Sequence, residues 1–177
     1  MLSLDHDQFG LDQLNFGLLV LRLVLGLFLA YHGYNKVFGK GGLSGTASWF
    51  GSMAMKWPKW QARAAAATEI GAGVMLALGV LTPFAAAGII GVMVVAIYTS
   101  HLKVGFFVFL PNQGWEYCAT IALGALAVGT MGPGEWSLDN VIDFSISGWG
   151  AMILTVALGV GGAAIHLATS YRPVKKS

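Results

Sequence analysis

Residues 14–38 read LNFGLLVLRLVLGLFLAYHGYNKVF, and this stretch decides the fold. Its first 18 residues, 14–31, are almost wholly apolar and are interrupted by one charged side chain, Arg22. About 20 such residues in a helix span the hydrocarbon core of a bilayer. The stretch then turns polar at His32 and Lys36, as a helix does where it leaves the lipid. The segment therefore predicts a transmembrane helix.

The same pattern recurs four times along the chain, at residues 62–81, 84–100, 117–131 and 148–170. Of the 177 residues, 56% are hydrophobic and 10% are charged, whereas about a quarter are charged in a typical soluble domain. The fold class predicted is an all-α, polytopic transmembrane helical bundle with the lipid bilayer as its solvent and nucleic acid excluded as a partner. Small residues four apart, as in Ala87 and Gly91, indicate close helix packing or simply the abundance of Gly and Ala in membrane helices. The other such pairs are Ala67 with Gly71 and Ala125 with Gly129.

The charged residues predict how the bundle is oriented. With five spans, the basic residues fall on one side of the membrane and the acidic ones on the other, and the positive-inside rule makes the basic side cytoplasmic. We expect residues 1–13 to be extracytoplasmic, the C-terminus to be cytoplasmic, and the protein to lie in a bacterial cytoplasmic membrane. Residues 38–59 are amphipathic and are expected to lie at the inner interface. The basic set is Lys36, Lys40, Lys56, Lys59, Arg63, Lys103, Arg172, Lys175 and Lys176; the acidic set is Asp5, Asp7, Asp12, Glu135, Asp139 and Asp143.

Two charged residues, Arg22 and Glu69, fall inside predicted spans, where each costs roughly 2.5–3.5 kcal/mol unless it has a partner. Arg22 lies ten residues before His32, and Glu69 lies six residues after Arg63. At the usual helical rise the two are expected at similar depth, and we predict an ion pair between them. The pair would be either a structural clamp or part of a functional site.

A second polar group is expected near the inner ends of the helices, where His32, Lys36, His101 and Glu116 meet the same interface. Together they would bind a small anion or a quinone carbonyl and pass protons near neutral pH. Alternatively, Lys36 reaches the lipid headgroups and Glu116 merely begins a helix. His166 adds a third imidazole, so a haem held by two histidines ranks below quinone. The single cysteine, Cys118, excludes a CxxC motif, and no metal ligands occur at typical spacing.

These features resemble the DoxX family of small bacterial membrane proteins over roughly residues 14–139. The resemblance is carried by the motifs around Arg22, His32 and Lys36, by Glu69, by Gly79-Val80-Leu81-Thr82-Pro83, and by later pieces. Those pieces are His101 with Gly105-Phe106-Phe107, Glu116-Tyr117, Gly132-Pro133-Gly134 and Ser137-Leu138-Asp139. The resemblance implies a four-helix domain at 14–139, to which residues 140–177 add a fifth transmembrane helix with a basic tail. It also implies a link to thiosulfate:quinone oxidoreduction or to membrane complexes that handle oxidative stress. The polar residues that the resemblance carries over are Arg22, His32, Lys36, Glu69, His101 and Glu116.

The leading hypothesis is a small membrane subunit of quinone-dependent redox metabolism. In it Arg22, Glu69, His32, His101 and Glu116 carry the chemistry, while Arg22, His32, Lys36 and His101 hold the quinone or small anion. Because no electron carrier is evident in the sequence, partner proteins in a membrane complex are expected to supply one. The alternative is a non-catalytic accessory or assembly subunit. A small-solute carrier ranks last, since no inverted repeat is visible.

Overall fold

The computed structural model describes residues 6–144 and 146–173, and all of its regular elements are helices. This confirms the all-α prediction. The basic Lys175 and Lys176 and the acidic Asp5 lie outside the described residues, as does the side chain of Asp7. The elements are α1 (His6–Phe38), α2 (Gly42–Ser52), α3 (Pro58–Leu78), α4 (Thr82–Ala96), the π-helix η1 (Ile97–His101), α5 (Glu116–Met131), α6 (Leu138–Val141) and α7 (Gly148–Ser170).

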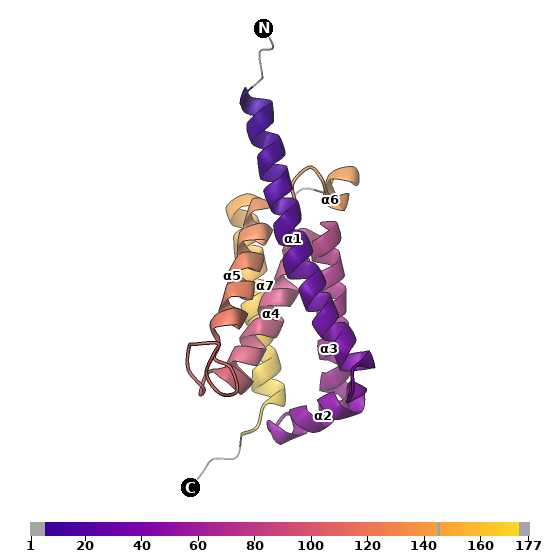
Figure 1. Cartoon of the computed structure of the whole chain (residues 1–177), viewed down its shortest axis with the longest axis vertical. Helices are drawn as coiled ribbons and strands as arrows, with labels where there is room; N and C mark the ends of the chain where they lie inside the picture. The colour runs from indigo at the N-terminus through magenta and orange to yellow at the C-terminus, as the bar shows by residue number, and fades with distance from the viewer. Residues whose placement is uncertain (1–5, 145, 174–177) are drawn as a thin grey trace.

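The long helices run roughly along one axis, with α1 beginning at one end and α7 ending at the other (Figure 1). Three helical stretches are long and apolar enough to cross a membrane, namely Gly10–Phe38, Thr82–His101 and Gly148–Ser170, and Glu116–Met131 is apolar but shorter. Large apolar side chains such as Ile165 (69% exposed) and Trp149 (76% exposed) project from the outside of the bundle. Such a surface is stable in lipid and not in water. The protein is therefore a multi-pass membrane protein.

The connections between the long helices do not add further spans. α2 lies at the end of the bundle where α1 finishes (Figure 1), and that this end is the inner interface stays a prediction. Residues 102–115 form an irregular loop between η1 and α5. Gly132-Pro133-Gly134 ends α5, and the chain then passes through the short α6 before entering α7. Which side of the membrane each terminus occupies stays a prediction.

Close backbone contact fixes how α1 packs on α3. A Cβ atom built on Gly26 would lie 2.4 Å from the Gly73 carbonyl oxygen, and one built on Gly73 would lie 2.5 Å from the Gly26 carbonyl oxygen. About two turns further along α1, a Cβ on Gly33 would lie 2.9 Å from both the Ala66 carbonyl oxygen and the Glu69 Cβ. These glycines allow the two antiparallel helices to touch backbone to backbone. They also determine which residues of α1 and α3 stand at the same depth.

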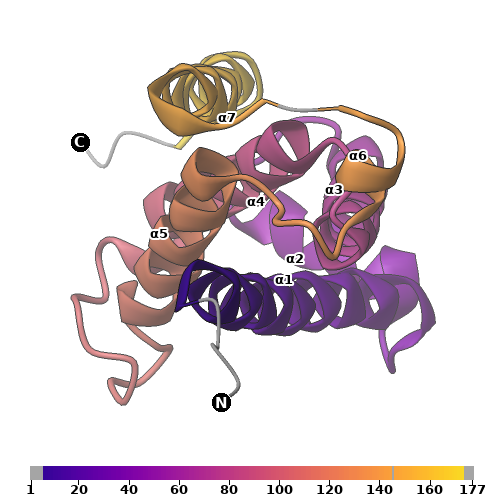
Figure 2. The same cartoon turned by 90° about the horizontal axis from the view of Figure 1, so that it is seen from above.

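α7 packs into the same bundle, beside α4 and α5 (Figure 2). Near its start, the Thr155 hydroxyl donates to the Pro83 carbonyl at 3.2 Å, and a Cβ on Gly159 would lie 2.9 Å from the Ala87 carbonyl. Past its end, Tyr171 forms an antiparallel bridge with Met55 in the α2–α3 connection. α7 is thus attached at both ends and forms one wall of the interior.

Candidate functional site

The polar residues of the interior form two separate clusters, one at each end of the α1–α3 pair. Gly33 of α1 stands level with Glu69, whereas Arg22 lies against Gly79 at the far end of α3. Residues 22 and 33 are eleven positions apart, which is about 16 Å along a helix. The predicted ion pair between Arg22 and Glu69 is therefore wrong. The sequence placed the start of this span at residue 62, but α3 begins at Pro58 and its first turns extend past the end of α1. Arg22 and Glu69 therefore do not stand at the similar depth that was predicted.

The cluster at the Gly79 end of α3, called the outer cluster after the side predicted for it, is organised around Arg22, whose side chain is fully buried. Its Nη2 donates to the Trp136 carbonyl, while Nε and Nη1 have no hydrogen-bond partner among the described residues. Gly79 makes room for the guanidinium, because a Cβ there would lie 1.7 Å from Arg22 Nη1. Nearby, Asn15 and Glu135 bond each other twice, through Asn15 Nδ2 to Glu135 Oε2 and Glu135 N to Asn15 Oδ1, both at 2.9 Å. The segment after α5 is thereby attached to α1.

Asp139 attaches the same segment to the α3–α4 turn. Its Oδ1 accepts from Leu81 N at 2.7 Å, and its Oδ2 accepts from Thr82 N at 2.9 Å and from the Thr82 hydroxyl at 2.7 Å. Leu81 has a left-handed backbone (φ 49°), so the carboxylate holds a strained turn and begins α4. Asp139 is 1% exposed, although the charge pattern had placed it with the solvated acidic residues of the outer face. We interpret the outer cluster as structural.

Replacing Asp139 with asparagine is expected to lower the free energy of unfolding by about 2 kcal/mol. The asparagine amide nitrogen cannot accept a hydrogen bond, so one of the two acceptor atoms that face Leu81 N and Thr82 is lost. Unfolding by SDS titration in mixed micelles measures the change. Asp12→Asn, at an exposed acidic position, is the control and should change stability by less than about 0.5 kcal/mol. Equal effects of the two substitutions would contradict the structural role of Asp139.

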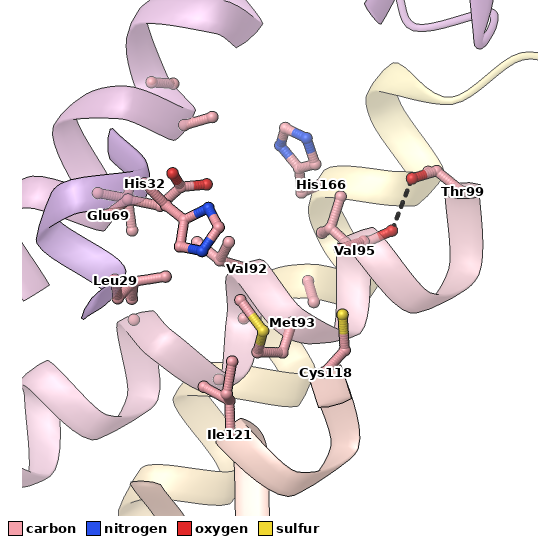
Figure 3. Close-up of a pocket in the computed structure, with 18 of the residues that line it drawn as sticks. Leu29, His32, Glu69, Val92, Met93, Val95, Thr99, Cys118, Ile121 and His166 are labelled. Carbon is pink, nitrogen blue, oxygen red and sulfur yellow. Dashed lines mark hydrogen bonds between the residues drawn. The ribbon is translucent and has the colours of Figure 1, made fainter. Parts of the chain in front are cut away.

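The second cluster contains Lys36 and Glu69, is called the inner cluster after the side predicted for it, and lines a cavity of about 750 Å³ in the bundle. The cavity is lined by residues of α1, α2, α3, α4, η1, α5 and α7, most of them apolar. Lys36 Nζ lies 2.6 Å from Glu69 Oε2, and the two side chains are only 20% and 5% exposed. Figure 3 shows Glu69 and His32 side by side on one wall, with His166 on the other. The polar residues that line it are His32, Lys36, Gln61, Thr68, Glu69, Thr99, Ser100, His101, Tyr117, Cys118, Thr120 and His166.

His101 is held between the cavity and the loop that follows it. Its Nδ1 lies 2.8 Å from the Gln113 carbonyl oxygen, and its Nε2 lies 3.3 Å from the Tyr117 hydroxyl. A carbonyl only accepts, so Nδ1 carries the proton, and in the neutral ring Nε2 accepts from Tyr117. His101 ends the π-helical turn η1, a type of turn that is common at functional sites. This pair connects the cavity to the loop at residues 102–115.

The cavity gathers four of the residues predicted for a site, namely His32, Lys36, Glu69 and His101. Arg22 does not line it, because Arg22 belongs to the outer cluster. Glu116 does not line it either: its carboxylate accepts from Val108 N at 3.0 Å, in the preceding loop. Glu116 stands in the first turn of α5, and a helix turns by about 100° per residue, so the next residue faces the cavity instead.

Sequence reasoning missed Tyr117 and treated His166 only as a haem candidate. Tyr117 stands beside Glu116, and nothing in its local pattern distinguishes it from the interfacial aromatic residues of other membrane proteins. His166 was visible as a polar residue inside an apolar span, which is the signal that should have placed it with the others.

The sequence model of the DoxX family matches residues 17–102. The match covers most of α1, all of α2, α3 and α4, and η1, and so includes His32, Lys36, Glu69 and His101. α5 and α7 lie outside it, with Tyr117, Cys118 and His166. No curated protein and no solved structure matches the chain.

Proposed function

We propose, from the premise that residues 17–102 belong to the DoxX family, that this membrane protein binds a quinone in its central cavity and serves quinone-linked redox metabolism. The observation that carries the proposal is the distribution of polarity in the cavity, which has apolar walls and polar side chains gathered at one end. A prenylated quinone has the complementary form, with a ring that carries two oxygens and an apolar tail. Pockets of this volume, mostly apolar with a few polar groups, are typical of small-molecule sites.

The charges of the polar end favour a neutral ligand over a small anion. Lys36 is the cation that lines the cavity, and Glu69 compensates it at 2.6 Å. With neutral histidines the polar end therefore carries no net charge, and an anion would meet an existing carboxylate. A quinone carbonyl needs only a hydrogen-bond donor, which His32 or the Lys36 ammonium supplies.

The same residues would handle the protons of quinone chemistry. Reduction of a quinone to a quinol takes up two electrons and two protons, one proton on each ring oxygen. His32 lines the cavity and can both donate and accept a hydrogen bond, and the hydrogen bond between His101 and Tyr117 connects the cavity to the loop at residues 102–115. We propose that the electrons come from a partner protein in a membrane complex. In this proposal Arg22 and Glu116 maintain the fold and do not contact the ligand.

A pair of adjacent glycines in α7 offers a test with a matched control. Gly162 lines the cavity and Gly161 does not, and a Cβ on either would meet open space. Gly162→Trp should therefore fold but fill the cavity, and we expect it to weaken quinone binding at least about tenfold, which corresponds to about 1.4 kcal/mol. Gly161→Trp should bind as the unaltered protein does. Isothermal titration of the nanodisc-reconstituted protein with a short-chain ubiquinone measures both affinities.

Failure of the unaltered protein to bind any quinone would overturn the proposed function. The non-catalytic accessory subunit would then be the better description, and co-purification with larger membrane proteins in a fixed ratio would test it. Equal affinities of Gly162→Trp and Gly161→Trp would show that quinone binds elsewhere on the protein.

A further inference from the structure

The wall of the cavity opposite Lys36 and Glu69 is formed by α7, which presents one polar side chain there. The residues of α7 that line the cavity follow helical spacing, so they share one face of the helix. Four of them have no polar side-chain atom, and the fifth is His166 with its imidazole ring. These residues are Leu158, Gly159, Gly162, Ala163 and His166.

The ring of His166 has no hydrogen-bond partner in the part of the chain that the structure describes. Among the described residues no hydrogen bond involves its Nδ1 or Nε2, although the side chain is half-buried. The His32 ring is likewise free of side-chain bonds in the described part of the chain. His101 differs, because both of its ring nitrogens are engaged. His32 is exposed and His166 is half-buried, so both rings are free to bond a molecule that enters the cavity.

The two rings approach the cavity from opposite sides. Figure 3 shows His166 projecting from α7 and His32 projecting beside Glu69, with the cavity between them. A neutral imidazole both donates and accepts a hydrogen bond. Each ring is therefore able to donate to a carbonyl oxygen and to accept from a hydroxyl group, which are the two forms of each quinone oxygen.

We propose that His166 and His32 hydrogen-bond opposite ends of the ligand, so that the site selects a ring with two oxygens in para positions. The inference rests on the proposed function and narrows it to a class of ligand. His166 lies outside residues 17–102, so this half of the site comes from a helix that the family match does not include. The competing role for His166 is contact with water or lipid headgroups, since α7 ends at Ser170, one turn later.

Two bicyclic compounds, one with two carbonyl oxygens in para positions and one with a single carbonyl oxygen, distinguish these roles. The first is 2,3-dimethyl-1,4-naphthoquinone, whose methyl groups block addition of the Cys118 thiol; the second is α-tetralone, which has one carbonyl. His166→Leu should weaken binding of the naphthoquinone about tenfold, the effect of losing one hydrogen bond, and should weaken tetralone less than about twofold, because its single oxygen can bond His32 instead. His166→Gln should recover part of the loss, since an amide also donates and accepts. Thr169→Leu, on the same helix but away from the cavity, should change neither affinity.

Isothermal titration in nanodiscs gives the affinities, and thermal unfolding shows whether each variant folds. Unchanged naphthoquinone affinity in His166→Leu, with binding by the unaltered protein, would overturn this inference and leave the proposed function standing. Equal losses for the naphthoquinone and tetralone would assign His166 a structural role and overturn it as well. If the unaltered protein binds neither compound nor ubiquinone, both the inference and the proposed function fail.

Discussion

Gly26→Val is expected to abolish the native bundle. The first side-chain atom would already lie 2.4 Å from the Gly73 carbonyl oxygen and 2.7 Å from the Ala77 backbone nitrogen, and valine adds two methyl groups to that atom. Both contacts are backbone atoms of a packed helix, so no side-chain rotation relieves them. We expect a loss of more than about 4 kcal/mol in the free energy of unfolding, seen as a collapse in the yield of monodisperse protein.

Gly17→Val is the matched control, because Gly17 lies on the same helix and a Cβ there meets nothing within 4 Å. Valine at this position should leave yield and thermal stability nearly unchanged, and a lipid-facing valine is well tolerated. Normal yield and unfolding of Gly26→Val would mean that α1 and α3 do not cross at Gly26 and Gly73. The depths assigned to Arg22 and Glu69 would then also be wrong.

Lys36→Met is expected to cost about 3 to 5 kcal/mol, because it leaves the Glu69 carboxylate unpaired at the cavity wall. Glu69 is 5% exposed, and its one ion-pair partner among the described residues is Lys36. Lys40→Met, at an exposed position four residues later, removes the same charge without removing a partner and should cost less than about 0.5 kcal/mol. Unfolding by SDS titration measures both. Similar small losses in the two variants would contradict the importance of the pair.

The exchange of the two charges tests whether the pair is a clamp or part of the site. Lys36→Glu combined with Glu69→Lys should recover most of the stability lost in either single variant, since the attraction between the two groups is restored. A pure clamp would also leave quinone affinity unchanged in the double variant. We expect the affinity to fall, because the exchange moves the ammonium from α1 to α3 and puts a carboxylate in its place at the polar end of the cavity.

Hydropathy was sufficient for the main features of the fold. The five apolar stretches predicted at 14–31, 62–81, 84–100, 117–131 and 148–170 lie in helices, except that residues 79–81 form the turn between α3 and α4, and the Gly-Pro-Gly at 132–134 ends α5 as expected. The segment between the first and second stretches contains α2, and residues 102–115, between the third and fourth, form a loop. Each of these features depends on side chains close together in sequence, so a local pattern is enough to predict it.

The packing partners of the glycines were less predictable. Gly91 and Gly129, which were noted for their spacing, do face other helices: a Cβ on Gly91 lies 3.3 Å from the Gly159 carbonyl, and one on Gly129 lies 3.0 Å from Ala86. Gly71, noted for the same reason, faces open space, whereas Gly26 and Gly73 make the closest contact between α1 and α3. Spacing identifies faces that allow close approach, but it does not identify which of them is used.

The sequence by itself determined that this chain is a membrane protein and which residues form its helices. It also determined that charged residues inside those helices need partners. Only the tertiary structure decided which groups those partners are. Glu69 pairs with Lys36, Arg22 donates to the Trp136 carbonyl, and Asp139 accepts from the α3–α4 turn. The physical reason is that hydrophobicity is a property of each segment alone, whereas an ion pair depends on the relative depth of two helices. Here the relative depth of α1 and α3 is set by backbone contact between Gly26 and Gly73, which are 47 residues apart in the chain. Sliding one helix by about three turns along the other would bring a different residue beside Glu69.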